Sequence, residues 1–181
     1  MKTTILYFVH GTTTDNAAKL CSGWKEAMLN DLGREQAQNL GRISKDREDK
    51  FDIIFTSDLR RAIESAEIAF PNIPKIADNR LRECNYGELD GKSKKLVIYE
   101  EHIDSKFPNG ESLKDVEKRV NEFINHIKQE YAGKTIGIVA HRAPQLALEV
   151  ILNKKAWSKA IENDWRKTGD WQPGWKYIIE S

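Results

Sequence analysis

Cysteine is scarce in this sequence of 181 residues, which contains only Cys21 and Cys84. Two distant cysteines cannot form the disulfide framework of a small secreted protein. The chain is long enough to bury a sizeable core without covalent cross-links. These features predict a single domain over residues 1–181 that folds in the reducing cytoplasm.

Long apolar runs are also missing, since none approaches the roughly 20 residues that a membrane-spanning helix requires. Residues 1–4 lead directly into a predicted strand, without the regions that mark a signal peptide. Hydrophobic residues make up 39% of the chain and charged residues 31%, as is typical of soluble globular proteins. We therefore expect a cytoplasmic protein that has no membrane partner.

An excess of one charge sign is absent as well, because the formal net charge is only +1. The chain as a whole therefore has no field that would attract nucleic acid, and any anion site must be a local cluster of basic groups. Spacings such as His-x-x-x-His or Cys-x-x-Cys are lacking, so no metal or other cofactor is expected. The sequence does not determine the oligomeric state.

Short apolar segments alternate with segments of helical periodicity. The strand segments are residues 4–9, 51–56, 75–77 and 135–140, with residues 175–179 as an edge strand. Helices are predicted over residues 31–43, 59–69, 112–131 and 143–152, and a short one near residues 94–101. Leu32, Ala37, Leu40 and Ile43 are expected to share the buried face of the first helix. This alternation predicts a three-layer α/β fold with a mostly parallel central sheet and helices on both faces.

Two of the predicted strands end in a histidine: His10, followed by Gly11, and His141. Ligands of parallel sheets bind outside the carboxyl ends of the strands. Arg61 lies at the start of a helix after another strand, and Glu83 lies in a loop. Two histidines, an arginine and a glutamate are suited to phosphoryl transfer, with a neutral histidine as nucleophile and a protonated glutamate as acid.

These segments resemble motifs of the histidine phosphatase superfamily, also called phosphoglycerate mutase-like, and most closely its phosphatase branch. The resemblance covers residues 5–152. His10, Gly11, Thr13 and Asn16 match the family's opening motif, Arg-His-Gly-x-Thr-x-x-Asn, and Ser57, Leu59, Arg61 and Ala62 match Ser-x-Leu-x-Arg-Ala. Leu81, Glu83 and Gly87 match Leu-x-Glu-x-x-x-Gly, and Gly110, Glu111 and Ser112 match Gly-Glu-Ser. His141 matches the family's late strand-end histidine.

The resemblance implies a role for each matched residue. His10 would be the nucleophile and Glu83 the proton donor, while Arg61 and a partly protonated His141 would clamp the phosphoryl group. Further contacts to phosphate or substrate would come from Gly11, Thr13 and Asn16. Two other readings stay open: Asn16 could instead cap a helix, and Glu83 could form a surface ion pair with Arg80 or Arg82.

One residue departs from the family pattern. The family places an arginine directly before the nucleophilic histidine, and this sequence has Val9 there. Either Val9 replaces the arginine or the arginine is deleted, and a deletion would turn His10 to the other face of the sheet unless the strand shifts. Arg142 or Arg60 is a candidate to supply the missing charge at the phosphate site.

The expected function is therefore a phosphatase of reduced activity that hydrolyses small phosphorylated metabolites through a phosphohistidine on His10. A phosphoglycerate mutase-type phosphotransferase is the nearest enzymatic alternative. A degenerate family member that binds phosphorylated ligands without turnover is the alternative from another class, and Val9 is the residue that supports it.

Restoring the arginine, by Val9→Arg or by insertion before His10, should raise turnover of a phosphate ester. A preorganised group of this kind contributes up to about 10²–10³ in rate. Steady-state kinetics of both variants against the natural sequence measure the gain. If neither variant is faster, the missing charge does not limit the reaction.

Overall fold

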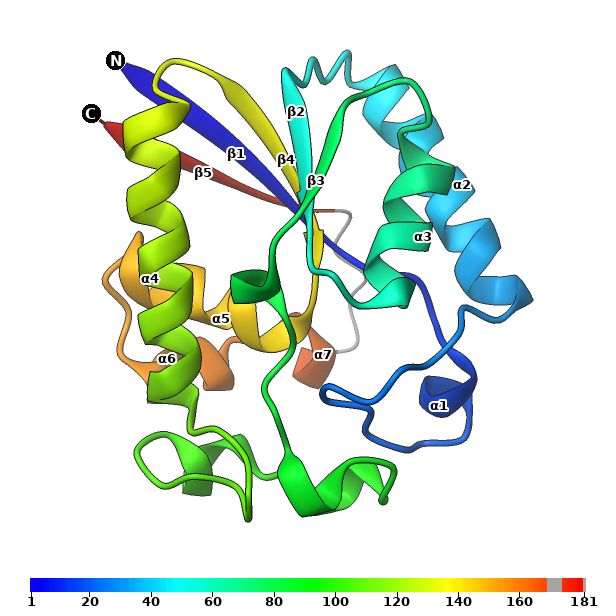
Figure 1. Ribbon diagram of the computed structural model, residues 1–181, viewed down its shortest axis with the longest axis vertical. Coiled ribbons are helices and arrows are strands. Elements are labelled where there is room, and N and C mark those ends of the chain that lie inside the picture. The colour runs from blue at the N-terminus through cyan, green and yellow to red at the C-terminus, as the bar shows by residue number, and fades with distance from the viewer. Residues whose placement is uncertain (169–173, 181) are drawn as a thin grey trace.

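The computed structural model describes residues 1–168 and 174–180. Within these residues, one five-stranded sheet has the order β3-β2-β4-β1-β5 (Figure 1). Its strands are β1 (Lys2–Val9), β2 (Ile53–Thr56), β3 (Lys75–Ala77), β4 (Thr135–Ala140) and β5 (Trp175–Glu180). The first four strands are parallel, and β5 pairs antiparallel with β1 at the edge. The predicted fold class is confirmed.

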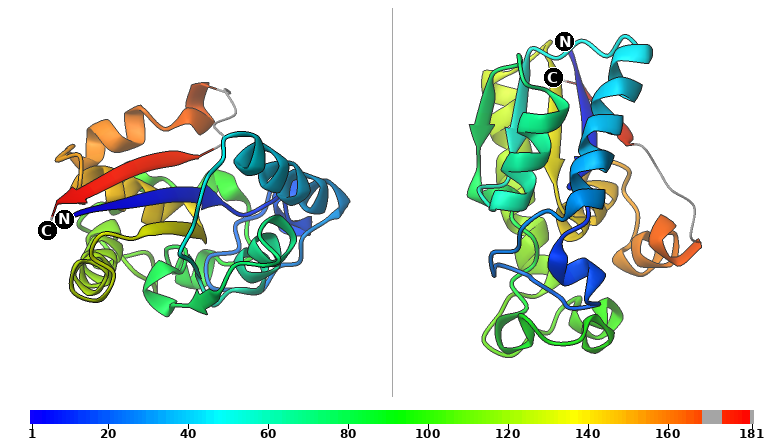
Figure 2. Two further views of the ribbon diagram at one scale, coloured as in Figure 1. Left: turned by 90° about the horizontal axis from the view of Figure 1, so that it is seen from above. Right: turned by 90° about the vertical axis from the view of Figure 1, so that its right-hand side faces the viewer.

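Helices cover both faces of this sheet. Helices α2 (Asp31–Asp46) and α3 (Arg60–Ala69) lie side by side on one face, and α4 (Leu113–Glu130) and α5 (Arg142–Ile151) cover the other (Figures 1 and 2). Successive side chains of each strand point to opposite faces of the sheet, so each strand contributes residues to both hydrophobic cores. Phe8, Ile54 and Val139 pack toward α2 and α3, whereas Ile5, Tyr7, Ile136 and Ile138 pack toward α4 and α5.

Side-chain caps set the starts of two helices. The Asn30 side chain accepts the Gly33 N–H at the start of α2, and Ser112 begins α4 with a capping box to Asp115. The buried face of α2 differs from the expectation at its first turn. Leu32 is 53% exposed, and Gly33 faces inward instead. The reason is a close backbone approach at Gly33, which leaves no room for a side chain there.

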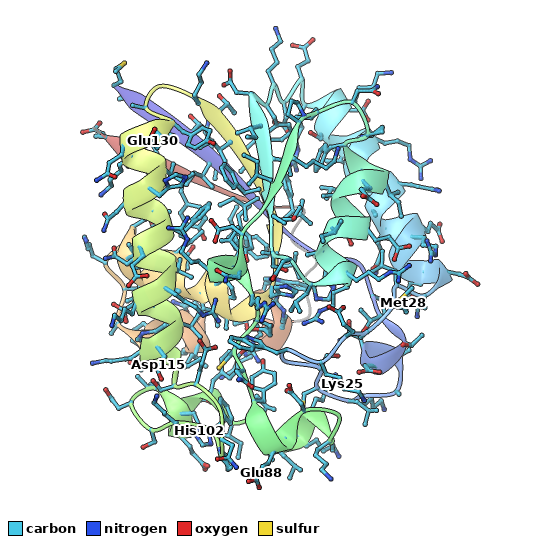
Figure 3. The ribbon with its side chains drawn as sticks, in the orientation of Figure 1. Lys25, Met28, Glu88, His102, Asp115 and Glu130 are labelled. Atoms are coloured by element: carbon cyan, nitrogen blue, oxygen red, sulfur yellow. The ribbon has the colours of Figure 1, made fainter. Side chains whose placement is uncertain are left out.

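The segment between β3 and α4 contains 3-10 turns in place of the expected short helix. These are η1 (Asn79–Leu81), η2 (Gly87–Leu89), η3 (Lys94–Leu96) and η4 (Tyr99–His102). Tyr86, Tyr99 and Phe107 from this segment are buried in the main core, so it forms a packed end of the domain. Figure 3 shows Glu88 and His102 at this end, away from the chain termini.

Three short helices have too few residues for sequence periodicity to reveal them. They are α1 (Thr14–Ala17), α6 (Trp157–Glu162) and α7 (Trp165–Thr168). Residues of helix α7 line the cavity described below. Among the described helices, none is long and apolar enough to cross a membrane.

Gly33→Ala should destabilise the fold. A Cβ on Gly33 would collide with the Thr12 carbonyl oxygen, and one on Gly11 would collide with the Gly33 carbonyl oxygen. Backbone must move to relieve such a clash, so we expect a loss of about 1–3 kcal/mol in the free energy of unfolding. Urea unfolding measures the loss against Gln38→Ala, an exposed change on the same helix. Equal stability of the two variants would contradict the close-approach argument.

Candidate active site

The parallel pairing of β1 with β4 brings the two strand-end histidines together. Val9 lies opposite Ala140 in the register, and the His10 N–H donates to the Ala140 carbonyl at 3.1 Å. The ring centroids of His10 and His141 are 5.0 Å apart. Residues separated by most of the chain therefore meet at the carboxyl edge of the sheet.

His10 is held in one tautomer. Its Nδ1 lies 2.7 Å from the Gly11 carbonyl oxygen, which can only accept a hydrogen bond. Nδ1 therefore carries the proton, and Nε2 keeps its lone pair. Burial, followed by the charges of Arg61 and Arg166, lowers the pKa of His10 to about 3, although the bond to Gly11 opposes this shift. The imidazole is neutral at physiological pH, as a nucleophile must be.

The described residues line a cavity of about 630 Å³ at this edge, and His10 and Gly11 form part of its wall. Six cationic side chains in the described lining face one carboxylate, that of Glu83. The cations are Arg61, Lys94, Lys95, Arg142, Arg166 and Lys167. Because the whole chain carries a net charge of only +1, this is the local basic cluster that an anion site requires.

Arg61 is fixed at the cavity by backbone carbonyls. Its Nη2 donates to the Gly23 carbonyl at 2.7 Å and its Nη1 to the Lys25 carbonyl at 3.1 Å. Burial lowers the pKa of Arg61, and the nearby carboxylates of Glu83 and Glu26 counteract this effect. A guanidinium stays charged under such conditions, so a rigid cation faces the cavity.

His141 is fully buried behind the cavity lining. Its Nε2 lies 2.6 Å from the Ser57 hydroxyl oxygen, while the Tyr7 hydroxyl donates to its carbonyl and accepts from its N–H. Its Nδ1 has no hydrogen-bond partner among the described residues. Burial, together with the charges of Arg61 and His10, holds the pKa of His141 well below its ordinary value. In the unliganded protein the ring is desolvated beside other cations, which disfavours its protonated form. Partial protonation of His141 beside a phosphate dianion stays a prediction.

The carboxyl group of the loop residue Glu83 contacts the first residues of α5. Its Oε1 accepts the N–H groups of Cys84 at 2.8 Å and Ala143 at 3.0 Å, and its Oε2 accepts that of Arg142 at 3.2 Å. These bonds place a carboxyl group at the N-terminus of a helix, where negative charge is favoured. The carboxyl group is fixed at the same cavity wall as His10.

The alternative reading, in which Glu83 forms a surface ion pair with Arg80 or Arg82, is contradicted. Arg80 pairs with Asp78, and Arg82 pairs with Asp58, both at 2.6 Å. Glu83 itself is only 9% exposed. Glu83 instead lies in the cavity lining, with both carboxyl oxygens bound to backbone N–H groups.

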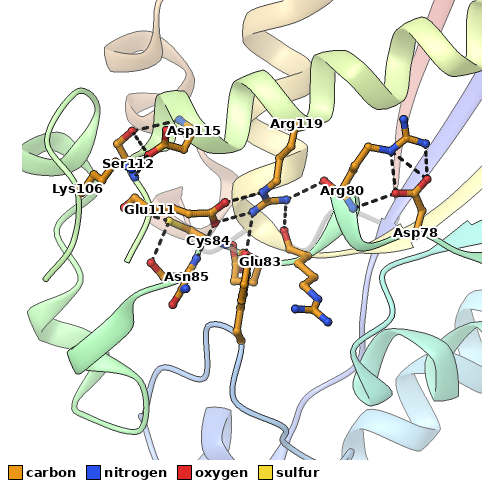
Figure 4. A network of polar contacts seen from close by, with 12 residues as sticks. Asp78, Arg80, Glu83, Cys84, Asn85, Lys106, Glu111, Ser112, Asp115 and Arg119 are labelled. Atoms are coloured by element: carbon orange, nitrogen blue, oxygen red, sulfur yellow. Dashed lines mark hydrogen bonds and ion pairs between the residues drawn. The ribbon is translucent and has the colours of Figure 1, made fainter. Parts of the chain in front are cut away.

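Arg119 of α4 holds the Glu83 loop in place (Figure 4). Its guanidinium donates to the carbonyls of Arg80, Arg82 and Glu83 at 2.7–2.9 Å and forms an ion pair with Glu111. Glu111 in turn accepts the N–H of Asn85. A charged network thus fixes the backbone on both sides of Glu83.

The loop after His10 has its own supports. The Gly11 N–H donates to the Ser65 hydroxyl at 3.0 Å. Thr13 is the N-cap of α1, and the Asn16 side chain completes the capping box by accepting the Thr13 N–H at 3.1 Å. Asn16 therefore takes part in capping, and it also lines the cavity. Thr13 is fully buried outside the described lining, and its hydroxyl accepts the Asn16 N–H, so it positions Asn16.

The two candidate substitutes for the missing arginine, Arg142 and Arg60, differ in their position relative to the cavity. Arg142 lines the cavity, and its guanidinium lies over the Tyr99 ring. Arg60 is exposed on α3 and lies outside the described lining. Sequence reasoning missed Arg166 because α7 leaves no periodic signal.

Comparisons with known proteins identify the family of this chain. The sequence matches the histidine phosphatase superfamily (branch 1) over residues 6–166. The chain belongs to this superfamily. One curated relative, the 2,3-bisphosphoglycerate-dependent phosphoglycerate mutase of Methylobacterium sp. (strain 4-46), is 32% identical over 80% of this chain and 77% of its own length. The phosphoglycerate mutase of Schizosaccharomyces pombe is 34% identical over 73% and 71%.

Solved structures of the superfamily share the fold. Bacillus stearothermophilus YhfR superposes with a TM-score of 0.81 at 27% identity and covers 98% of this chain and 91% of its own. The alpha-ribazole phosphatase from Shigella flexneri has a TM-score of 0.76 at 24% identity, covering 90% and 84%, which shows likeness of fold alone. This chain is therefore similar in sequence to mutases and in fold to a phosphatase.

Acid should destabilise the protein through its two neutral histidines. In the unfolded chain histidine has a pKa of about 6.5, whereas the folded pKa of His10 is about 3 and that of His141 is also lowered. The unfolded state binds more protons between these values, so stability is full above about pH 6.5 and falls as pH decreases. Each histidine contributes up to about 1.4 kcal/mol per pH unit.

Urea unfolding of the natural sequence and His10→Gln at several pH values between about 7 and 5 measures this linkage. The variant should show the smaller slope, since one of the two buried histidines is gone. Identical slopes would mean that His10 is protonated to the same degree in both states.

Proposed function

We propose that this protein hydrolyses small phosphate monoesters through a phosphohistidine on His10. The observation that carries the proposal is the His10 tautomer: Nδ1 donates to the Gly11 carbonyl, and the ring lines a cavity rich in cations. A neutral imidazole with a free Nε2 is a nucleophile, and the surrounding cations attract a phosphate dianion.

In the first step, His10 Nε2 attacks phosphorus and forms a P–N bond while the P–O bond to the alcohol breaks. Glu83, in its protonated form, gives its proton to the departing oxygen. In the second step, water attacks phosphorus, the P–N bond breaks, and Glu83 takes a proton from that water. Inorganic phosphate leaves, and the free imidazole is restored. The position of the Glu83 carboxyl at the same cavity wall supports both proton transfers.

Arg61 and His141 hold the phosphoryl oxygens in this proposal. Arg61 offers a charged guanidinium that is already fixed by two carbonyls. If the Ser57 hydroxyl donates to His141 Nε2, then Nδ1 carries a proton and donates to the phosphoryl group from a neutral ring. The lack of any described partner for Nδ1 supports this arrangement. Gly11, Asn16 and Arg142 line the same cavity and serve as further contacts.

A phosphoglycerate mutase activity is the second candidate, and the curated relatives named as mutases favour it. The two activities share the phosphohistidine and differ in its acceptor, which is water in a phosphatase and a phosphoglycerate in a mutase. Assays with 3-phosphoglycerate distinguish them: release of inorganic phosphate supports the hydrolase, and formation of the 2-phospho isomer supports the mutase.

Brief incubation with p-nitrophenyl phosphate should add one phosphoryl group to the protein, because the phosphohistidine is the first product. Intact-mass spectrometry after rapid quenching detects the adduct, and peptide mapping should assign it to His10. His10→Ala should lose the adduct and reduce hydrolysis to background. His102→Ala, which changes a histidine stacked on Phe107 outside the cavity, is the matched control.

Ligand binding without adduct or hydrolysis in the natural sequence would instead identify a binding protein that has lost turnover. A label on any residue other than His10 would overturn the proposed nucleophile.

A further inference from the structure

The C-terminal part of the chain brings a second arginine to the phosphate site. Arg166 belongs to α7, yet it lines the same cavity as His10 and Arg61. Nothing in its sequence surroundings marks it as a site residue, because α7 is only 4 residues long. Its place at the cavity results from tertiary packing.

A buried carboxylate holds Arg166 in position. The Asp164 side chain is fully buried, and its Oδ1 accepts the Arg166 N–H at 3.1 Å and Nη1 at 2.9 Å. Its Oδ2 accepts Nε of Arg142 at 2.5 Å. Burial would raise the pKa of Asp164, but the two arginines outweigh it and lower that pKa. One ionised carboxylate thus orients two guanidinium groups and leaves a net positive charge at the cavity.

One hydrogen-bond donor of Arg166 has no partner in the part of the chain that the structure describes. Its Nη2 is buried and has no partner among the described residues. Buried donors of a charged group are normally paired, so an unpaired one in a cavity wall indicates a place for an acceptor. An anion bound beside His10 and Arg61 would supply acceptor oxygens.

Val9, the residue directly before His10, has no side-chain donor that could bind such an anion. Strand β1 stays in register with β4 from Thr4 to Val9, so the position before His10 is a regular strand position. Val9 fills it with an apolar side chain that also lines the cavity. The cavity wall therefore carries no charged side chain at the position directly before His10.

We infer that Arg166 provides, to a phosphoryl group at His10, the guanidinium that Val9 cannot provide, and that Asp164 is the residue that positions it. The inference rests on the proposed function in that it assumes phosphate binding beside His10. Both guanidinium groups are bound by Asp164 and lie over an aromatic ring, Arg142 over Tyr99 and Arg166 over Trp165. They differ in that Arg166 has a buried Nη2 with no partner among the described residues. The charge of Arg166 also acts on the imidazole, since it contributes to the lowered pKa of His10.

Arg166→Gln tests the inference because glutamine keeps a donor for Asp164 and removes the charge. Isothermal titration with orthovanadate, an analogue of the transferring phosphoryl group, measures binding without turnover. Affinity should fall about 10- to 100-fold, as expected for loss of one charged hydrogen bond. Arg166→Lys should recover part of the loss. Arg42→Ala, which removes an exposed arginine of α2 outside the described lining, should bind as the natural sequence does.

Val9→Arg then tests whether positions 9 and 166 can each supply the same guanidinium to a bound phosphoryl group. In the Arg166→Gln background it should restore most of the affinity, and in the natural background its effect should be smaller. Because the positive charge is lost, Arg166→Gln should also raise the pKa of His10 in an NMR titration, which a purely structural role would not do. Equal effects of Val9→Arg in both backgrounds would show that the positions act independently and would overturn the inference.

The test also separates this inference from the proposed function. Orthovanadate binding that depends on Arg166, in a protein without hydrolysis, supports the inference and removes the phosphatase. Hydrolysis with Arg166→Gln binding orthovanadate as tightly as Arg42→Ala overturns the inference and leaves the phosphatase intact. Absence of orthovanadate binding in the natural sequence overturns the inference as well.

Discussion

The parallel pairing of β1 with β4 is the constraint on which the site depends. It aligns Val9 with Ala140, so His10 and His141 leave the sheet side by side. A shift of one residue would turn His10 to the opposite face, because side chains alternate along a strand. Cores on both faces of the sheet oppose such a shift, since it would move Phe8 and Tyr7 out of their clusters.

Desolvation gives this site its chemistry. The pKa of each histidine is lowered by burial first and by neighbouring arginines second, so both rings are neutral without a ligand. The same burial strengthens the interaction of the cavity cations with an anion. Backbone carbonyls hold Arg61, and Asp164 holds Arg142 and Arg166, so these positive charges are fixed at the cavity without a ligand.

Charge at a phosphate site has to be near phosphorus, and its position in the sequence is irrelevant to that requirement. Val9 and Arg166 illustrate the point, because the apolar residue lies in the family's motif and the arginine lies in a short helix near the C-terminus. Under the inference made above, Arg166 supplies from α7 the charge that Val9 lacks. The described lining of the cavity is strongly basic although Val9 is apolar.

The sequence by itself determined the α/β class and the main strands and helices, because hydrophobic periodicity is a local property. It also identified His10, Arg61, Glu83 and His141 as candidate site residues, because motif spacing can be read along the chain. It did not determine that Leu32 is exposed, that Ser57 and Tyr7 bind His141, or that Arg166 reaches the cavity. Only the tertiary structure decided these points and the neutrality of both histidines. Burial, hydrogen bonding and electrostatic interaction depend on which distant residues come into contact, and no local pattern encodes those contacts.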